Sequence, residues 1–440
     1  MSQTKLLIIG GIAGLAIIGL LTFLVLGSLG GGKIQEATLQ FWGVFDEDIF
    51  YRDTIAQFSK DNPGVRVIYR KFNFEDYESQ LIDSFAAGTG PDVWLMHNTW
   101  LPKHADKIQP LPLDSVKDRG DLLTFKDFQN QFVDVSVEDL TINGQIYAMP
   151  LYVDTLALYY NKDILNTVGV VSPPKTWEEF NDVVRKIVVF DSRGNISRAG
   201  GAIGTARNIN RSSDVLMLLM LQSGVKMTDD SFSSATFSRS VENINVGETA
   251  LQYYTDFANP AKQVYTWNDS QHYSIDAFVN GETAMMFNYS HHIKTIRDKS
   301  ARFNFGVTPM PQISGAPVVI NFANYWAPTV SKQSPNFDAA WKFISYLTSA
   351  QGSVSYINYS NRPSARRDVI EQQKNDPDIG PFASQALSAR SWYQVDSSAI
   401  ETIFADMIDD VNFGRASIRQ AVQTAENKVS ILMNRARNSF

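Results

Sequence analysis

The sequence predicts an α/β protein built from two lobes. With 440 residues, the chain is longer than a single hydrophobic core usually serves, so two lobes are expected. Its hydrophobic residues follow strand and helix periodicities in alternation, with short connections between them. Hydrophobic residues make up 44% of the chain and charged residues 19%, which is typical of a folded globular body.

The first elements after residue 37 follow the order β-α-β-α-β. Apolar patterning predicts strands at 37–42, 65–69 and 92–96. Helical spacing of large apolar residues predicts helices over Tyr51–Phe58 and Tyr77–Phe85. Asn62-Pro63-Gly64 ends the first helix and Gly88 ends the second. This order predicts a parallel sheet with helices on its faces.

The same alternation resumes in the second half of the chain. Helices are predicted at 177–189, 213–222, 247–258 and 274–280, and around Trp341–Leu347. Strands are predicted at 284–288 and 305–307, with an extended segment at 318–330. The last hundred residues are mostly helical, as the spacing of Ile400, Phe404 and Ile408 indicates.

Composition excludes several classes of function. The chain has no cysteine, which rules out disulfides, thiolate metal sites and lipid attachment through a thiol. Its net charge of −7, without a basic patch, argues against nucleic acid as a partner. No phosphate-binding loop, GxSxG elbow or HExxH motif is present, so we expect no cofactor, no metal and no catalysis.

The amino-terminal segment 6–29 predicts attachment to a membrane. It carries no charged side chain, and its length at ~1.5 Å per residue suffices to span the ~30 Å hydrocarbon layer. A cleaved signal peptide has a shorter apolar region, although cleavage near 28–30 is the alternative. We expect residues 1–36 to form a cytoplasmic tail, a transmembrane anchor and a glycine tether. The body then faces outside the cell.

Polar and aromatic side chains follow two of the predicted strands. Strand 37–42 runs into WGVFDED, and strand 92–96 runs into HNTW. In open α/β sheets, ligands bind beyond the carboxyl ends of the strands. Sugars suit such a place, because their C–H faces stack on aromatic rings and their hydroxyls accept and donate hydrogen bonds. Two acidic residues here, Asp46 and Asp48, are also a conceivable glycosidase pair, but carboxylates near a helix start ordinarily serve the helix dipole.

An ordered series of motifs resembles the extracellular solute-binding proteins of ABC importers, in particular their carbohydrate-binding group. The resemblance extends from about residue 38 to 427. The motifs are FAAGTGPDVWLMHNTWLP, IQPLPLD, NGQIYAMPLYVDTLALYYNKDIL, PPKTWEEF, FVNGETAMMFNYSHHI and NFGVTPMP.

This resemblance implies a periplasmic-binding-protein-like fold (a venus flytrap) whose two α/β lobes close on a solute. Residues 37–150 and 322–360 would form the amino-terminal lobe, and residues 155–320 and 365–440 the carboxy-terminal lobe. The chain would pass between the lobes at 151–154, 320–324 and 361–364.

The resemblance also implies nine ligand-binding residues, which lie on strand-end loops and at the crossings. They are Asp46, Glu47, Asn98, Trp100, Asp154, Tyr289, His291, Trp326 and Arg362. Alternatives remain for several of them: Glu47 as a helix cap, Asp154 and Arg362 as hinge contacts, and Trp326 as core. His291 stands where relatives commonly have tryptophan, which weakens the assignment of a sugar.

The resulting prediction is a membrane-anchored receptor that captures a sugar or oligosaccharide and delivers it to ABC permease subunits. One alternative is the same fold binding a non-sugar solute. Another is an anchored sensor or adhesion module that feeds no transporter, and a third is a glycan-processing enzyme.

Overall fold

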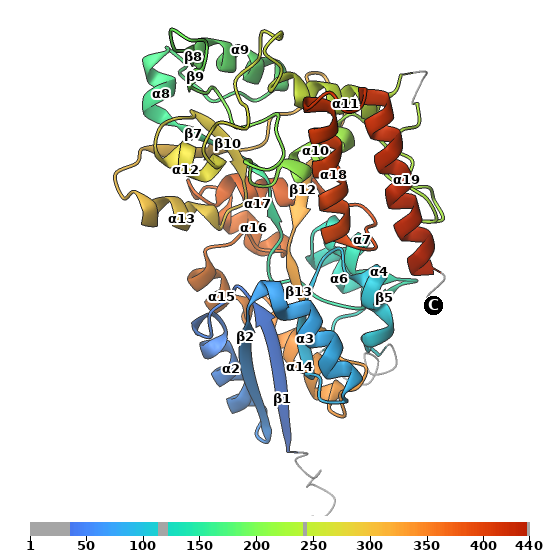
Figure 1. Cartoon of the computed structure of the whole chain (residues 1–440). Coiled ribbons are helices and arrows are strands. Elements are labelled where there is room, and N and C mark those ends of the chain that lie inside the picture. The colour runs from blue at the N-terminus through green and yellow to red at the C-terminus, as the bar shows by residue number, and fades with distance from the viewer. Residues whose placement is uncertain (1–35, 113–121, 241–243, 438–440) are drawn as a thin grey trace, which may run out of the picture.

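The chain folds into two bodies, one above the other in Figure 1, each built around its own sheet. The computed structural model describes residues 36–112, 122–240 and 244–437. The predicted tail, anchor and tether therefore lie outside the described residues. Among the residues that are described, no helix has the length and apolarity needed to cross a membrane.

The first body contains a four-stranded sheet in the order β13-β3-β1-β2. Strand β1 (Ala37–Val44) pairs in parallel with β2 (Val65–Phe72) and with β3 (Val93–His97). The three strands of the predicted β-α-β-α-β series are thus parallel to one another, as expected. The fourth strand, β13 (Trp326–Val330), runs antiparallel to β3, so the complete sheet is mixed. The direction reverses because β13 enters at the end where β3 finishes, with Trp326 opposite His97.

Helices cover both faces of this sheet, as the apolar spacing predicted. Helix α2 (Ile49–Asp61) buries Tyr51 and Phe58, and α3 (Phe74–Ala86) buries Tyr77, Leu81 and Phe85. The other helices and strands of this body are α14 (Phe337–Leu347), α15 (Ser353–Ser360), α4 (Leu101–His104), η1 (Ala105–Lys107), α6 (Phe125–Gln131), α7 (Asp134–Leu140), β4 (Thr141–Ile142) and β5 (Gln145–Ile146).

The second body contains an antiparallel sheet in the order β10-β7-β11. Its strands are β7 (Ala157–Asn161), β10 (Met285–Asn288) and β11 (Phe305–Thr308). Helix α10 (Ser212–Gln222) buries every residue from Ser212 to Met220, as an apolar helix with neighbours on all sides does.

The remaining elements of the second body surround that sheet and α10 (Figure 1). They are α8 (Lys162–Thr167), α9 (Trp177–Ile187), β8 (Val189–Phe190), β9 (Ile196–Arg198), α11 (Val246–Asp256), α12 (Ser274–Val279), α13 (His292–Lys299), α18 (Ser397–Asn412) and α19 (Ile418–Arg437). Helices α16 (Arg367–Gln373) and α17 (Gly380–Ala386) lie near the junction of the two bodies.

Three segments connect the bodies and hydrogen-bond to one another. A small sheet joins β6 (Asp154–Thr155), β12 (Asn321–Asn324) and β14 (Ala389–Arg390). The backbone N–H of Val153 donates to the carbonyl of Pro363 at 3.1 Å, which ties the first connection to the third. We call residues 151–154, 320–324 and 361–364 the crossings.

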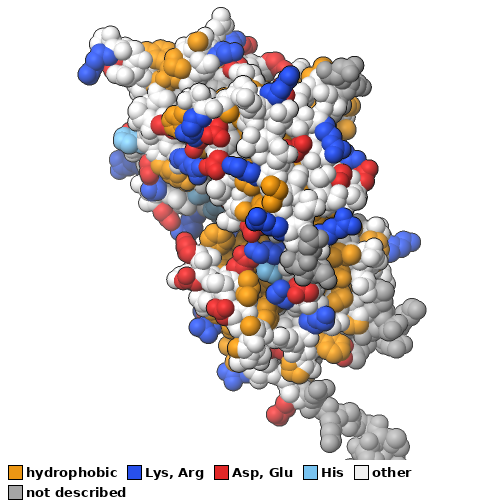
Figure 2. Space-filling view, turned by 45° about the vertical axis from the view of Figure 1, so that its right-hand side comes forward, with side chains coloured by type: hydrophobic (Ala, Val, Ile, Leu, Met, Phe, Trp, Pro, Cys, Tyr) orange, Lys and Arg blue, Asp and Glu red, His pale blue; other side chains and the backbone are white. Residues whose placement is uncertain are grey.

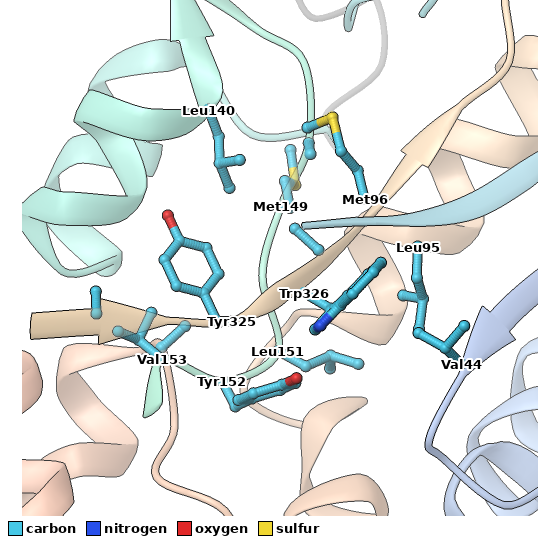
Figure 3. Packing of buried hydrophobic residues seen from close by; sticks show 14 of the residues in the cluster. Val44, Leu95, Met96, Leu140, Met149, Leu151, Tyr152, Val153, Tyr325 and Trp326 are labelled. Atoms are coloured by element: carbon cyan, nitrogen blue, oxygen red, sulfur yellow. The ribbon is translucent and has the colours of Figure 1, made fainter. Parts of the chain in front are cut away.

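The predicted extended segment at 318–330 is broken into two strands. Val318 and Val319 are exposed and precede β12, and Tyr325 separates β12 from β13. Figure 3 shows the Tyr325 and Trp326 side chains leaving this segment in different directions, Tyr325 toward Leu140 and Trp326 toward Leu95. The hydroxyl of Tyr325 donates to Asp139 at 2.8 Å, so the break satisfies a buried polar group.

Tyr77 holds β3 beside β1 where the two strands no longer pair. The ladder between them ends at Trp42 opposite Trp94. Beyond it, the Tyr77 hydroxyl accepts from the backbone N–H of Leu95 at 3.0 Å. Its proton faces two carbonyls, that of Leu95 at 2.9 Å and that of Trp42 on β1 at 3.2 Å. Tyr77 is fully buried.

We therefore expect Tyr77→Phe to lower the free energy of unfolding by about 1–3 kcal/mol, the cost of leaving buried backbone groups unpaired. Chemical denaturation of the variant measures the change. Tyr160→Phe is the matched control, since Tyr160 is half-buried on β7, and it should leave stability unchanged. Equal stability of the Tyr77 variant and the wild type would contradict this role.

Candidate ligand-binding cavity

A cavity of about 990 Å³ lies between the two bodies. Side chains of both bodies and of all three crossings line it. This volume is at the upper end of the range for small-molecule sites. The elements that supply the lining come from sequence positions as far apart as Phe45 and Glu401.

The first body contributes an aromatic wall. Trp100 follows β3 and Trp326 begins β13, so the pairing of these strands brings the two indoles together, with ring centroids 5.0 Å apart. Phe45 and Phe74 continue the wall at 5.9 and 6.2 Å from Trp326. Edge-to-face contacts of this kind fix the ring orientations.

The first crossing and the second body contribute polar and charged groups. The Asp154 carboxylate accepts hydrogen bonds from the Ser290 backbone N–H and hydroxyl, the latter at 2.7 Å. His291 lies beside it, with Nδ1 3.9 Å from a carboxylate oxygen. The hydroxyl of Tyr289 donates to Asp214 at 2.5 Å. These contacts place an acceptor, a ring and an imidazole on one wall.

Arg211 completes that wall at the start of α10. Its guanidinium pairs with Asp214 at 2.6 Å, and one nitrogen lies 3.3 Å from Glu401. It also lies 5.6 Å from the centroid of the Tyr289 ring. The burial of Arg211 works to lower its pKa, but the nearby Asp214, Tyr289 and Glu401 raise it, so the side chain stays charged.

Arg362 and Tyr152 line the cavity where the crossings meet. The Arg362 guanidinium lies 4.3 Å from the Tyr152 ring centroid and forms an ion pair with Asp46 at 3.0 Å. It donates to the Tyr356 hydroxyl at 3.0 Å. These contacts hold the third crossing against the end of β1.

Six of the nine predicted ligand residues line this cavity. They are Trp100, Asp154, Tyr289, His291, Trp326 and Arg362. The other three, Asp46, Glu47 and Asn98, are not part of the lining.

Asp46 and Glu47 are committed to other partners. Asp46 is buried and accepts from Tyr51 and Tyr356. Glu47 points away from the cavity, where it pairs with Lys71. Asp48, the second member of the conceivable glycosidase pair, pairs with Arg52 on the surface, so the two aspartates do not face each other across a substrate site.

Asn98 turns into the protein between the two bodies. Its amide group donates to Asp139 at 2.9 Å and to Ser391 at 3.2 Å. Within the HNTW segment, Asn98 therefore bonds to Asp139 and Ser391 and is not part of the lining, whereas His97, Thr99 and Trp100 line the cavity.

The sequence did not point to several lining residues. Tyr152 stands two positions before Asp154 in the motif that identified the first crossing, so it could have been found there. Asn210, Arg211 and Asp214 belong to no motif, and only the packing of α10 brings them to the cavity. Phe45 and Phe74 carry no polar group that would single them out.

The cavity holds more acidic than basic residues. The acidic ones are Glu75, Glu78, Asp154, Asp214, Asp396 and Glu401, and the basic ones are Lys103, Arg211 and Arg362. Desolvation lowers the pKa of His97 to about 4 and that of His292 to about 3, so both are neutral near pH 7. No group of His, Asp and Glu in the described part of the chain has a metal-binding arrangement.

The face shown in Figure 2 carries basic and acidic side chains in alternation, without a large region of one sign. The described residues on this face therefore give no electrostatic footprint for a nucleic acid.

Comparison with known proteins identifies the family. Residues 53–381 match the family described as bacterial extracellular solute-binding protein. The chain belongs to the bacterial extracellular solute-binding proteins. Among curated members, this solute-binding protein is 24% identical to the maltodextrin-binding protein MdxE of Bacillus subtilis, over 85% of each chain. It is 22% identical to the galactooligosaccharide-binding protein of the same organism, over 90% of each chain.

Solved structures share the fold of this solute-binding protein. The sugar-binding protein MalE from Xanthomonas citri aligns with a TM-score of 0.74 at 22% identity, covering 91% of this chain and 98% of its own. The cyclic α-maltosyl-1,6-maltose binding protein from Arthrobacter globiformis aligns with a TM-score of 0.74 at 19% identity, covering 91% and 99%. The two-lobed α/β fold predicted from the sequence is thereby confirmed.

Asp139, the partner of Asn98, makes stability depend on pH. Desolvation raises the pKa of its carboxyl to about 7, although hydrogen bonds from Asn98 and Tyr325 oppose the rise. A raised folded-state pKa stabilises the fold fully below about pH 4, the ordinary value for aspartate, and this contribution is lost as the pH rises through about 7.

We expect the melting temperature of the wild type to fall relative to that of Asp139→Asn between pH 5 and pH 8. The variant keeps a neutral side chain with a carbonyl acceptor throughout this range. Thermal denaturation of both proteins at intervals of half a pH unit measures the difference. A difference that stays constant over the range would show that the carboxyl does not titrate in this window.

Proposed function

We propose that this protein captures a sugar or a short oligosaccharide outside the cell and delivers it to the membrane subunits of an ABC importer. The observation that carries the proposal is the pairing of two unlike walls around one cavity. Trp100 and Trp326 offer apolar ring surface from the first body. Asp154 of the first crossing and His291 of the second body offer hydrogen-bonding groups. A sugar has both kinds of surface.

Similarity to carbohydrate-binding relatives supports this choice of solute. The relatives named above bind maltodextrin, galactooligosaccharide and maltosyl-maltose by their descriptions. The charge of the cavity argues against an anionic solute, because its acidic residues outnumber its basic ones and repel anions.

In this proposal, residues 37–150 with 322–360 and residues 155–320 with 365–440 are the two lobes, which close by bending at the crossings. Closure follows when the solute binds the closed arrangement better than the open one. Asp154 belongs to the first crossing and lines the cavity, so a ligand on this carboxylate contacts the hinge itself.

The proposal includes a single-pass anchor at residues 6–29, with the body facing outside. Its support is the uncharged apolar run in the sequence and membership in an extracellular family. An anchor keeps the receptor near its permease without a lipidated cysteine, which this chain lacks. Permease genes beside the gene for this chain would favour transport over a sensing or adhesion role.

A ligand screen tests the choice of solute. The full-length protein in detergent micelles is screened by thermal shift with mono- and oligosaccharides, amino acids, polyamines and dicarboxylates. A bound sugar at a hundred times its Kd should stabilise the fold by about 2.7 kcal/mol. A response confined to non-sugar solutes would refute the carbohydrate assignment. Chromatography of the incubated oligosaccharides should show no cleavage, and cleavage would favour the enzyme alternative.

His291→Ala should weaken binding of the sugar found in that screen about tenfold, or about 1.4 kcal/mol. The His291 side chain is half exposed beside Asp154, so its removal costs a hydrogen-bonding group without disturbing the core. Isothermal titration calorimetry measures the affinity. His272→Ala is the matched control, since His272 is exposed, pairs with Glu282 and lies outside the lining. Equal affinity of the two variants would place the ligand away from this wall.

A further inference from the structure

Two phenylalanine rings stand exposed at one part of the cavity. Phe45 is 49% exposed and Phe74 is 50% exposed, whereas Trp100 and Trp326 in the same wall are 8% and 6% exposed. The two phenylalanine rings stack with centroids 5.2 Å apart and an interplanar angle of 28°. They leave apolar ring surface in water, which is costly unless something covers it.

The backbone at Phe45 is strained in a way that presents this ring. Phe45 has a φ of 63°, a left-handed value that bulky residues rarely adopt. The Asp46 N–H donates to the Val44 carbonyl at 2.6 Å, so the three residues form a γ-turn centred on Phe45. Strain of this kind persists where the surroundings enforce it, and it gathers at ligand clamps.

The residue that enforces the turn is Asp46. Its carboxylate is fixed from three sides by Tyr51, Tyr356 and Arg362. Its carbonyl accepts from the Tyr69 hydroxyl at 2.9 Å. With Val44 held in β1 and Asp46 held by these partners, the chain between them has room only for a tight reversal, and the Phe45 ring projects into the cavity.

The exposed pair is continuous with the deeper wall. Both phenylalanine rings contact Trp326, which in turn contacts Trp100. Glu75, the next residue after Phe74, also lines the cavity, and its exposed carboxylate accepts hydrogen bonds from hydroxyl groups. The Phe74 ring with the Glu75 carboxylate beside it thus offers the same two kinds of group, an aromatic face and an acceptor, as Trp100 and Asp154 do.

We propose that Phe45 and Phe74 form a stacking platform for a further unit of an oligosaccharide, whose first unit lies between Trp326 and Asp154. The platform makes the protein select oligosaccharides over monosaccharides. This inference rests on the proposed function, since it takes the solute to be a sugar. It assigns to Asp46 a positioning role, in place of the ligand contact that the sequence suggested.

The test compares sugars of increasing length with three variants of the full-length protein in detergent micelles. The sugars are glucose, maltose, maltotriose and maltotetraose, together with galactose and its β-1,4-linked dimer and trimer. Calorimetry gives the affinity for each. Phe74→Ala removes one ring at the start of a helix, where alanine is well tolerated. Phe45→Gly removes the other ring and relieves the strain at positive φ.

The control variant is Phe190→Ala. Phe190 is 44% exposed and stacks on Tyr265 with centroids 5.9 Å apart, outside the cavity lining. It therefore reproduces the loss of an exposed, stacked phenylalanine without touching the platform.

We expect the wild type and the control to bind the longer sugars of one series more tightly than its monosaccharide. Phe74→Ala and Phe45→Gly should each lose about tenfold in affinity for the trisaccharide while keeping the affinity for the shortest sugar that binds. The melting temperature of Phe45→Gly should not fall. That result separates a binding role for Phe45 from a structural one.

Two outcomes overturn the inference while leaving the sugar receptor in place. In the first, the platform variants keep the gain in affinity with length. In the second, they lose affinity equally for sugars of every length. If none of the seven sugars binds the wild type, the carbohydrate assignment fails and the platform proposal fails with it.

Discussion

The ion pair between Asp46 and Arg362 is the contact on which the geometry of the cavity depends. It joins the end of β1 to the third crossing, residues that are more than three hundred positions apart in the chain. Two tyrosine hydroxyls share the same carboxylate, and the Tyr152 ring covers the guanidinium. Burial of two charges costs desolvation free energy, which their attraction offsets only when both groups are well hydrogen-bonded. Removal of one partner typically lowers the stability of the fold by about 3–5 kcal/mol.

The ion pair between Asp46 and Arg362 also lies among the segments that connect the two bodies. Tyr152 belongs to the first crossing and Arg362 to the third, so their contact links two of the three connections at the edge of the cavity. The remaining connection, the second crossing with β12, pairs with β6, where Asn324 lies opposite Asp154. A solute bound between the walls therefore meets side chains whose backbones belong to the connections themselves.

Much of the fold was accessible from the sequence because local periodicity specifies it. The first five elements lie where apolar spacing placed them, and six of nine candidate residues line one cavity. The remaining features depend on contacts between distant segments, which local patterns do not encode. The antiparallel direction of β13 depends on its pairing with β3, a strand that lies far from it in the sequence. Asn98 followed a strand end as a ligand residue would, but Asp139 and Ser391 offered it partners in the interior. Arg211 reaches the cavity only through the packing of α10.

The late arrival of β13 has a consequence for how the polypeptide acquires its structure. Strand β3 is buried from Val93 to Met96, yet its neighbour on one side is Trp326–Val330. Until the ribosome has made that stretch, one edge of β3 has no strand to pair with, and the sheet of the first body is incomplete. Pairings between such distant segments form slowly, because the closure of the intervening loop comes first. The sheet of the first body can therefore be completed only after residue 330 has been synthesised.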